Sequence, residues 1–473
     1  MTLSIRNPRT GECDYRITPL DAAQIAATAA VLRKQQLAWA AFPAAERGQM
    51  LRRLGAAIMQ HFDAIAAALT VDTGRQAISA IEVDGTIRAL ERWAALGPDL
   101  IARTSADRPS ATPGIMVSTR LVPYPLVGVI SPWNFPLTLA LIDAIPALAA
   151  GCAVIVKPSE VTPRFIAPLM AAIAEVPGLP LSIIEGDGAT GAAMVELVDY
   201  LAFTGSVATG RKVAAAAARH FIPASLELGG KDPMIILASA DPVWAADIAL
   251  RASIVNTGQA CQSIERIYVA QQIVEPFMAA LVEKAAAVRL NFPEIGVGDI
   301  GPFIFDKQAA IVQAQIDDAI SRGATLLSGG TVEQLGGGLY LRPTVLTGVT
   351  DDMSVMREET FGPVLPVTAF GSVDHAVALA NAGEFGLSAA VLAGSVEEAE
   401  AVAIRLNAGA VSINDGALTS MVWDAEKSSF GASGLGPSRM GESGLLRFFR
   451  KQALIKQTGY ALPTSAYAED AKR

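Results

Sequence analysis

One cysteine of the chain lies in surroundings that favour a reactive thiol. Cys261 stands in the segment NTGQACQS (256–263), whose residues are small or polar and could leave the sulfur exposed. The thiolate is the form of cysteine that acts as a nucleophile toward a carbonyl carbon. Cys152, in the apolar segment GCAVIV (151–156), is predicted to be an inert core residue instead.

A carboxylate stands where a general base could act. Glu227 ends an otherwise apolar run, SLEL (225–228). A carboxylate there is either paired structurally or tuned as a base, and the residues alone leave the two interpretations about even. The histidines His61, His220 and His375 have no recognisable motif around them. A papain-like Cys–His hydrolase and a zinc site are therefore disfavoured, and we expect no metal.

The elements that must position these residues alternate between short apolar runs and helical segments. This alternation predicts an open parallel sheet, whose ligand binds beyond the carboxyl ends of the strands. The runs lie at 127–130, 153–156, 181–184, 201–204 and 225–228. They are followed by PWN (132–134), KPSE (157–160), GDG (186–188), GS (205–206) and GGK (229–231).

A second series of the same kind begins after Lys231. Because apolar runs again alternate with helical stretches, it predicts a second α/β domain. Its apolar runs lie at 267–269, 364–369, 389–392 and 410–413, with helical stretches at 373–381 and 395–406.

Two glycine-rich turns in the first series could meet a phosphate group. GDGATG (186–191) has GxGxxG spacing, but it lacks the acidic residue expected about twenty positions on, so we interpret it as a connecting turn. GSVATG (205–210) precedes a helical segment, where bare backbone N–H groups could bind a phosphate. Neither turn is specific by itself.

Composition disfavours several classes of partner. The formal net charge is −9 and no run of Lys or Arg is long enough to follow a nucleic-acid backbone. The N-terminus has no signal-peptide pattern, and three cysteines are too few for a disulfide framework. The apolar stretch 121–156 is long enough for a membrane span, but prolines break it into short pieces. We therefore expect a cytoplasmic protein that binds neither nucleic acid nor membrane.

Taken together, six segments are similar, in their order, to motifs of the NAD(P)-dependent aldehyde dehydrogenase superfamily. The resemblance covers nearly the whole chain, and six ordered motifs make chance a poor explanation. They are PWNFP (132–136), KPSE (157–160), FTGS (203–206), ELGGK (227–231), GQAC (258–261) and EETFGP (358–363).

The resemblance implies an aldehyde-dehydrogenase-like α/β fold. Its parts would be an open parallel-sheet cofactor domain, a second α/β catalytic domain and a small oligomerisation β-element of a homodimer or homotetramer. The alternative for that element is ordinary edge strands and a loose tail. The implied boundaries are 1–109 and 124–228 for the cofactor domain, 229–449 for the catalytic domain, and 110–123 and 450–473 for the oligomerisation element.

The resemblance also implies a role for each catalytic residue. Cys261 would attack a small-molecule aldehyde as thiolate, and the Asn134 side chain and the Cys261 N–H would hold the oxyanion. Hydride transfer would leave a thioester, which water activated by Glu227 would hydrolyse. The implied cofactor is NAD, with NADP as the alternative, because Lys157 and Glu160 would bind the adenosine ribose and a carboxylate repels a 2′-phosphate.

The same resemblance implies residues that bind cofactor and substrate. Gly205 and Ser206 would face the pyrophosphate, Glu359 the nicotinamide ribose and Phe361 the ring. The full cofactor set is Ile130, Pro132, Trp133, Lys157, Ser159, Glu160, Gly205, Ser206, Leu228, Gly229, Glu359 and Phe361. The candidate substrate residues are Phe135, Leu139, Ile142, Gln262 and Trp423, which are apolar or neutral. We therefore favour an apolar or aromatic aldehyde over succinate semialdehyde.

The chain departs from the family pattern near its end. The segment SFGASGLGPSRMG (429–441) differs from the usual ending, the connection from Asn414 to Phe430 is longer than in the common classes, and Asp143 stands where many relatives carry Lys. The alternatives are a CoA-acylating enzyme, a semialdehyde-specific dehydrogenase and a non-catalytic NAD-binding protein on the same scaffold. Glu227 disfavours the first of these. Glu227, Cys261 and Asn134 together disfavour the last.

Overall fold

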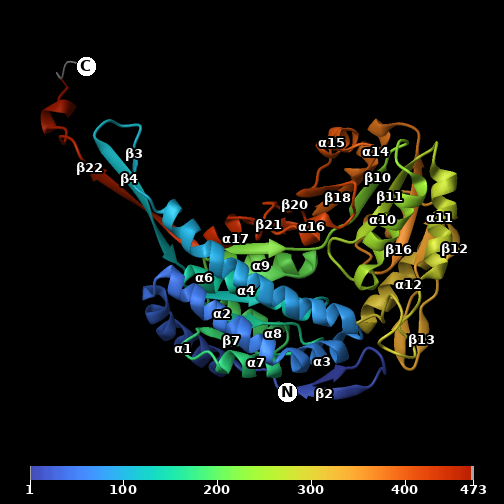
Figure 1. The fold of residues 1–473 in the computed structure, drawn as a ribbon, viewed down its shortest axis with the longest axis horizontal. Coiled ribbons are helices and arrows are strands. Elements are labelled where there is room, and N and C mark those ends of the chain that lie inside the picture. The colour runs from blue at the N-terminus through green and yellow to red at the C-terminus, as the bar shows by residue number, and fades with distance from the viewer. Residues whose placement is uncertain (1, 470–473) are drawn as a thin grey trace.

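The body of the molecule contains two open sheets covered by helices, and a narrow arm projects from it (Figure 1). The computed structural model describes residues 2–469. The first sheet has the strand order β21-β9-β8-β5-β6-β7, in which only β21 is antiparallel to its neighbour. Its strands are β5 (Leu126–Ile130), β6 (Ala153–Lys157), β7 (Leu181–Ile183), β8 (Tyr200–Thr204), β9 (Ala224–Glu227) and β21 (Gly434–Leu435).

The five predicted apolar runs of the first series are confirmed as strands of this sheet. Strands β6 and β8 are buried along their whole length, because helices cover both faces of a parallel sheet. The crossover helices are α5 (Pro136–Leu141) and α6 (Ala144–Ala150) after β5, α7 (Ile166–Ala174) after β6, α8 (Gly188–Val195) after β7 and α9 (Val207–Arg219) after β8.

The N-terminal helices pack on the same sheet and its crossover helices (blue in Figure 1). A capping box between Asp21 and Gln24 starts the first of them. Apolar residues that recur every three or four positions form one stripe, which faces the core. The helices are α1 (Ala22–Ala41), α2 (Ala44–Gln60), α3 (Phe62–Thr73) and α4 (Gln76–Thr104).

The second sheet has the order β12-β15-β16-β11-β10-β18-β19 and confirms the predicted second α/β unit. Three of its strands, β10, β12 and β15, were not predicted, because each is short and β10 carries Asp and Pro. The strands are β10 (Asp232–Ile236), β11 (Ile264–Ala270), β12 (Thr325–Ser328), β15 (Thr344–Thr347), β16 (Val364–Phe370), β18 (Ser388–Leu392) and β19 (Ala410–Ile413). The helices beside them are α10 (Pro242–Ile254), α11 (Val274–Ala287), α12 (Asp306–Ser321), α13 (Ser354–Arg357), α14 (Val373–Ala380) and α15 (Val396–Ala403).

Short two-stranded sheets and single-turn helices complete the body of the molecule. They are the pairs β1 (Leu3–Arg6) with β2 (Cys13–Ile17), β13 (Glu333–Leu335) with β14 (Gly338–Tyr340) and β17 (Phe385–Gly386) with β20 (Phe430–Gly431), and the turns α16 (Leu418–Met421) and α17 (Ser443–Leu446).

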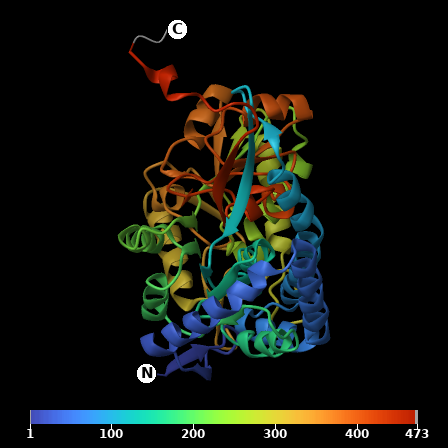
Figure 2. The same ribbon diagram turned by 90° about the vertical axis from the view of Figure 1, so that its left-hand side faces the viewer.

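The arm is a three-stranded antiparallel ribbon in the order β22-β4-β3. Its strands are β3 (Arg108–Pro109), β4 (Ile115–Pro123) and β22 (Phe449–Gln457), and Figure 1 shows β4 and β22 running side by side away from the body. In Figure 2 the arm faces the viewer. All β22 side chains after Phe449 are exposed. The two segments expected to form an oligomerisation element therefore pair with each other within one chain. Residues 470–473 of that element lie outside the described residues.

The segment after β20 returns to the first sheet. Strand β21 pairs with β9, and Leu445, Phe448 and Phe449 belong to the core under that sheet. Residues 434–449, which the predicted boundaries assign to the catalytic domain, therefore include segments that pack with the first sheet. A two-residue strand among glycines carries no periodic signal, which is why the sequence did not indicate this return.

Within residues 2–469 no single helix is long and apolar enough to cross a membrane. Helices α2 and α3 are long and apolar enough only when taken together, and the chain bends by 69° between them.

The packing of α1 predicts a large effect of one substitution. Trp39 is fully buried, and its Nε1 donates to the Leu148 carbonyl at 2.9 Å. Trp39→Ala should lower the free energy of unfolding by about 3–5 kcal/mol, because it leaves a cavity and an unpaired carbonyl. The measurement is thermal and urea unfolding. Leu37→Ala, at 72% exposure on the same helix, is the control and should change it by less than about 0.5 kcal/mol. Equal losses in both variants would contradict this packing.

Candidate active site

Asn134 connects the carboxyl edge of the first sheet to the loop that carries Cys261. The residue is buried in the turn after β5, and its Nδ2 donates to the Gln259 carbonyl at 3.0 Å. Its own backbone carbonyl accepts from Arg75 Nη2 and from Asn256 Nδ2, each at 3.0 Å. The bond to Gln259 uses one N–H of the Asn134 amide, so the second N–H can meet another acceptor.

The chain reaches Cys261 through a turn with strained backbone. Asn256, Thr257 and Gly258 have φ of 59°, 59° and 69°, in the left-handed region. Such backbone is unfavourable for residues that carry a Cβ and persists only where the surroundings fix it. A Cβ on Gly258 would lie 2.3 Å from the backbone of Gly362, so this position requires glycine.

Buried hydrogen bonds hold this strained turn. The Thr257 hydroxyl donates to the Gly301 carbonyl at 3.1 Å, and the Gln259 side chain donates to the Asn256 carbonyl at 3.1 Å. Gln259 Oε1 also accepts from the Ile304 N–H at 2.9 Å. The turn before the thiol is therefore fixed from several sides, as expected of a loop that must present one atom.

The Cys261 side chain is partly exposed at the end of this turn. Burial raises the pKa of its thiol to about 11, and Glu359 and Asp232 raise it further, whereas Lys427 and Arg439 lower it. The thiol is thus the main form at neutral pH. The cations near it decide how readily the nucleophilic thiolate forms.

Glu227 lies at the carboxyl end of β9, where the first sheet approaches the Cys261 loop. Its Oε2 accepts from the Ser429 hydroxyl at 2.8 Å, and its Oε1 lies 3.9 Å from Arg439 Nε. The Glu227 side chain is 15% exposed. The sequence left open whether this carboxylate is paired or able to act as a base, and in the structure it has one hydrogen bond and one nearby cation.

Lys427 is a cation at this site that the sequence did not indicate. It lies in the connection between α16 and β20, and its Nζ donates to the Thr419 carbonyl at 3.2 Å. Burial lowers its pKa, while Glu227, Cys261 and Asp232 raise it. The local sequence resembles that of any surface lysine, so only the length of the connection could have drawn attention to it.

Asp143 forms a buried ion cluster with two arginines. Its Oδ2 accepts from Arg439 Nη2 at 2.9 Å, and its Oδ1 accepts from Arg447 Nη2. Burial alone would raise the pKa of Asp143, but the two guanidinium groups outweigh it and lower the pKa overall. Asp143, noted in the sequence as a departure from the family pattern, therefore holds the segment after β21 against the first sheet.

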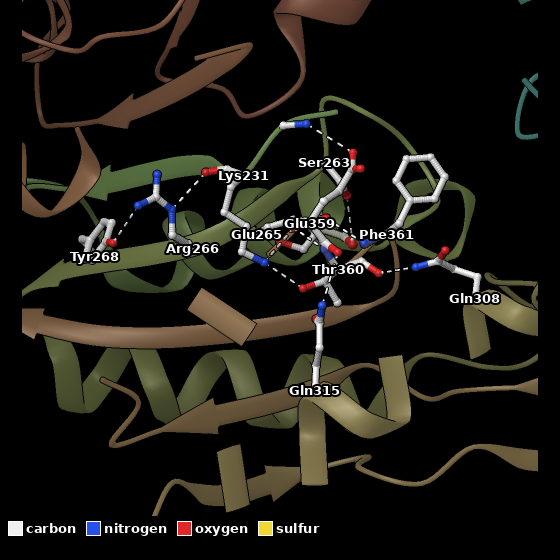
Figure 3. Close-up of polar contacts among 12 residues, drawn as sticks. Lys231, Ser263, Glu265, Arg266, Tyr268, Gln308, Gln315, Glu359, Thr360 and Phe361 are labelled. Carbon is white, nitrogen blue, oxygen red and sulfur yellow. Dashed lines mark hydrogen bonds and ion pairs between the residues drawn. The ribbon is translucent and has the colours of Figure 1, made fainter. Parts of the chain in front are cut away.

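The loop that carries Glu359 and Phe361 is anchored by a buried ion pair (Figure 3). Lys231 Nζ donates to Glu265 Oε2 at 2.7 Å and to the Thr360 hydroxyl at 2.7 Å. The same Glu265 carboxylate accepts from the backbone N–H groups of Thr360 and Phe361, each at 2.8 Å. This fixes the loop beside the starts of β10 and β11.

Glu359 lies over the glycine pair that follows β9. Its Oε1 accepts from the Gly230 N–H at 3.2 Å, and a Cβ on Gly229 would lie 2.4 Å from its Oε2. Burial, with Glu265 and Asp232 nearby, raises the pKa of Glu359 to about 8. On the other side of this loop, the Phe361 ring packs edge-on against Trp133 with centroids 5.4 Å apart.

The remaining cofactor candidates line the carboxyl edge of the first sheet. Lys157 Nζ lies 3.2 Å from Glu160 Oε2 after β6, and Ser206 caps the N-terminus of α9 after β8. Strands β6 and β9 are separated by β8 and β5, about 14 Å at ~4.8 Å per strand. These residues therefore cannot all touch one small group, but they fit an extended dinucleotide. The other candidates at this edge are Ile130, Pro132, Ser159, Gly205 and Leu228.

The substrate candidates come from two places. Phe135, Leu139 and Ile142 lie on and beside α5, and the Gln262 carbonyl Oε1 accepts from the Thr419 hydroxyl at 3.1 Å. Trp423 has the Arg92 guanidinium over its ring at 4.9 Å, so a cation missed by the sequence analysis lies beside it. Among residues 2–469 there is no group of three His, Cys, Asp or Glu side chains that could hold a metal.

Comparisons with known proteins agree on one family. A model of the aldehyde dehydrogenase family matches residues 1–454. A protein of Mycolicibacterium smegmatis named "Putative succinate-semialdehyde dehydrogenase" with NADP(+) is 39% identical over 92% of this chain and 84% of its own length.

Solved structures give the same result. "Putative Aldehyde Dehydrogenase PutA" from Anabaena variabilis has a TM-score of 0.96 at 50% identity, over 98% of this chain and 99% of that one. Betaine aldehyde dehydrogenase from Staphylococcus aureus, solved with NAD+, has a TM-score of 0.89 at 30% identity, over 98% and 93% of the two chains.

The charges around Cys261 predict an effect of Lys427 on thiol ionisation. Lys427→Met removes a cation that lowers the thiol pKa, so this pKa should rise above its present value of about 11. Each unit of increase lowers the thiolate fraction at pH 8 about tenfold. The measurement is the rate of iodoacetamide alkylation against pH, with Cys261→Ala to assign the reactive thiol.

Lys34→Met is the matched control, because Lys34 is exposed on α1. It should leave the alkylation profile unchanged. An identical profile for Lys427→Met and Lys34→Met would mean that Lys427 does not act on the thiol.

Proposed function

The chain belongs to the aldehyde dehydrogenase family, and on that basis we propose that it oxidises an aldehyde to a carboxylic acid with NAD, or NADP as the alternative, through a covalent intermediate on Cys261. The observation that carries the proposal is the fixed turn before Cys261. This turn is hydrogen-bonded to Asn134. The positive charges of Lys427 and Arg439 lie near the Cys261 thiol at its end.

The first step forms a bond between Cys261 Sγ and the aldehyde carbon. The carbonyl π-electrons move to oxygen, which becomes an oxyanion. The second N–H of the Asn134 amide and the Cys261 backbone N–H receive it. Both donors are neutral, and hydrogen bonds already hold the residues that carry them. They therefore stabilise the negative charge without large reorganisation.

A dinucleotide bound here would accept a hydride from the aldehyde carbon. What remains on Cys261 is a thioester. Glu227 then takes a proton from water while the water oxygen bonds to the acyl carbon and the C–S bond breaks. To do so, the carboxylate must turn away from the Ser429 hydroxyl that now holds it. The products are the free thiolate and the carboxylic acid.

Residues at the edge of the first sheet would bind the cofactor. Lys157, Ser159 and Glu160 would hold the adenosine ribose, and Gly205 with Ser206 would face the pyrophosphate at the N-terminus of α9. Glu359 would hold the second ribose after leaving the Gly230 N–H. The Ile130–Trp133 turn, Leu228, Gly229 and Phe361 would line the nicotinamide end.

The substrate is proposed to be an apolar or aromatic aldehyde. Phe135, Leu139 and Ile142 support this, because they present apolar groups from α5. The semialdehyde named for the mycobacterial relative is the second candidate, and the cations Lys427 and Arg92 favour it. The arm, with its exposed β22, supports assembly as a homodimer or homotetramer.

Removal of the nucleophile tests the reaction. Cys261→Ala should lower NADH formation by at least about 10³-fold with every aldehyde, since no thiohemiacetal can form. The assay compares benzaldehyde, hexanal and succinate semialdehyde, each with NAD and with NADP. Cys13→Ala, at an exposed cysteine, is the matched control and should keep full activity. Undiminished turnover in Cys261→Ala would refute the mechanism, and a requirement for added CoA would indicate the acylating alternative.

Glu160 is expected to determine whether the enzyme prefers NAD or NADP. Its carboxylate beside Lys157 would repel the 2′-phosphate of NADP, so Glu160→Gln should raise the ratio of kcat/KM for NADP over NAD about tenfold. Glu175→Gln, at a carboxylate that pairs with His61 at the surface, is the control and should leave the ratio unchanged. Equal ratios in the wild type and Glu160→Gln would remove Glu160 from cofactor selection.

A further inference from the structure

Arg439 brings a buried guanidinium to Glu227 from a distant part of the chain. Its side chain is 8% exposed, and its Nη2 donates to Asp143 at 2.9 Å and to the Thr204 hydroxyl at 2.6 Å. These two bonds fix the side chain at the carboxyl end of β8, next to the end of β9. The guanidinium therefore has little freedom to move away from Glu227.

One donor of this guanidinium is unused. Arg439 Nε is buried and makes no hydrogen bond within the described residues, while Glu227 Oε1 lies 3.9 Å from it. A buried donor without an acceptor is unfavourable, so a small turn of the carboxylate that closes this gap is stabilising. Glu227 thus has two donors beside it: Ser429, which it uses, and Arg439 Nε, which it can reach.

The charges at this place pair Glu227 with the buried arginine cluster. Asp143 is shared by Arg439 and Arg447, so this buried cluster carries one net positive charge. The Glu227 carboxylate neutralises it. Lys427 adds a second cation that faces Glu227, and Cys261 is the remaining titratable group near both cations.

We infer that Arg439 is a positioning residue for the general base: its guanidinium attracts the Glu227 carboxylate, and its free Nε donor guides that carboxylate between the Ser429 hydroxyl and the water that attacks the thioester. This inference rests on the proposed function. Arg439 contacts neither aldehyde nor cofactor in this role. Its charge also favours the Cys261 thiolate, whereas its Nε donor faces Glu227 and bears only on the hydrolytic step.

The test separates acylation from hydrolysis by using p-nitrophenyl acetate, which acylates the thiol without any cofactor. The burst of p-nitrophenol reports acylation, and the steady phase reports hydrolysis of the acyl-enzyme. Arg439→Lys keeps the positive charge but loses the Nε donor, so it should keep the burst rate within about twofold and slow the steady phase about tenfold at pH 7.

Arg447→Lys is the matched control. It disturbs the same buried Asp143 cluster, but the ion pair of Arg447 is with Asp143 and not with Glu227. Both of its phases should stay within about twofold of the wild type, even if its Tm falls as far as that of Arg439→Lys. Arg439→Met removes the charge as well as the donor. It should slow both phases, the steady phase more than the burst, and it provides the comparison if Arg439→Lys does not fold.

Two results would overturn the inference. One is an equal steady phase in Arg439→Lys and Arg447→Lys, and the other is an equal slowing of burst and steady phase in Arg439→Lys. Failure of the proposed function gives a different result: no burst that depends on Cys261, or a steady phase that is undiminished in Glu227→Gln.

Discussion

The hydrogen bonds that converge on Asn134 hold the two units of this molecule together at the site. Arg75 of the N-terminal helices and Asn256 of the second unit donate to one carbonyl, and the Asn134 amide donates back to Gln259. Since buried polar groups must be paired, none of these partners can shift alone without leaving another unsatisfied. This network compensates the backbone strain of the turn before Cys261 and holds the turn in its left-handed conformation.

Buried ion clusters fix the two other sides of the site. Glu265 accepts from Lys231 and from two backbone N–H groups, and Asp143 accepts from Arg439 and Arg447. A buried carboxylate is tolerated only when several donors surround it, and those donors must then lie in definite directions. Ionic contacts therefore fix the positions of the loops after β9, α13 and β21 more closely than apolar packing would.

The sequence was sufficient for the strands of the first sheet and for the residues that follow them. Apolar runs of four or five residues have a clear signal, and the carboxyl ends of parallel strands must meet at one edge. It could not indicate Lys427 or Arg439 as neighbours of Glu227. Arg439 lies 296 positions from its partner Asp143, and an ion pair at such a separation leaves no local pattern. The return of β21 to the first sheet was missed for the same reason.

That return also determines when the first sheet can be completed during synthesis. Its edge strand, part of its core and both arginine partners of Asp143 lie beyond residue 433. A nascent chain that has already formed β5 to β9 still holds Asp143 without its cations, and the groove for residues 434–449 is uncovered. The last strand of the second sheet, β19, ends at Ile413, so the first sheet begins earlier in the chain but its last strand is synthesised later.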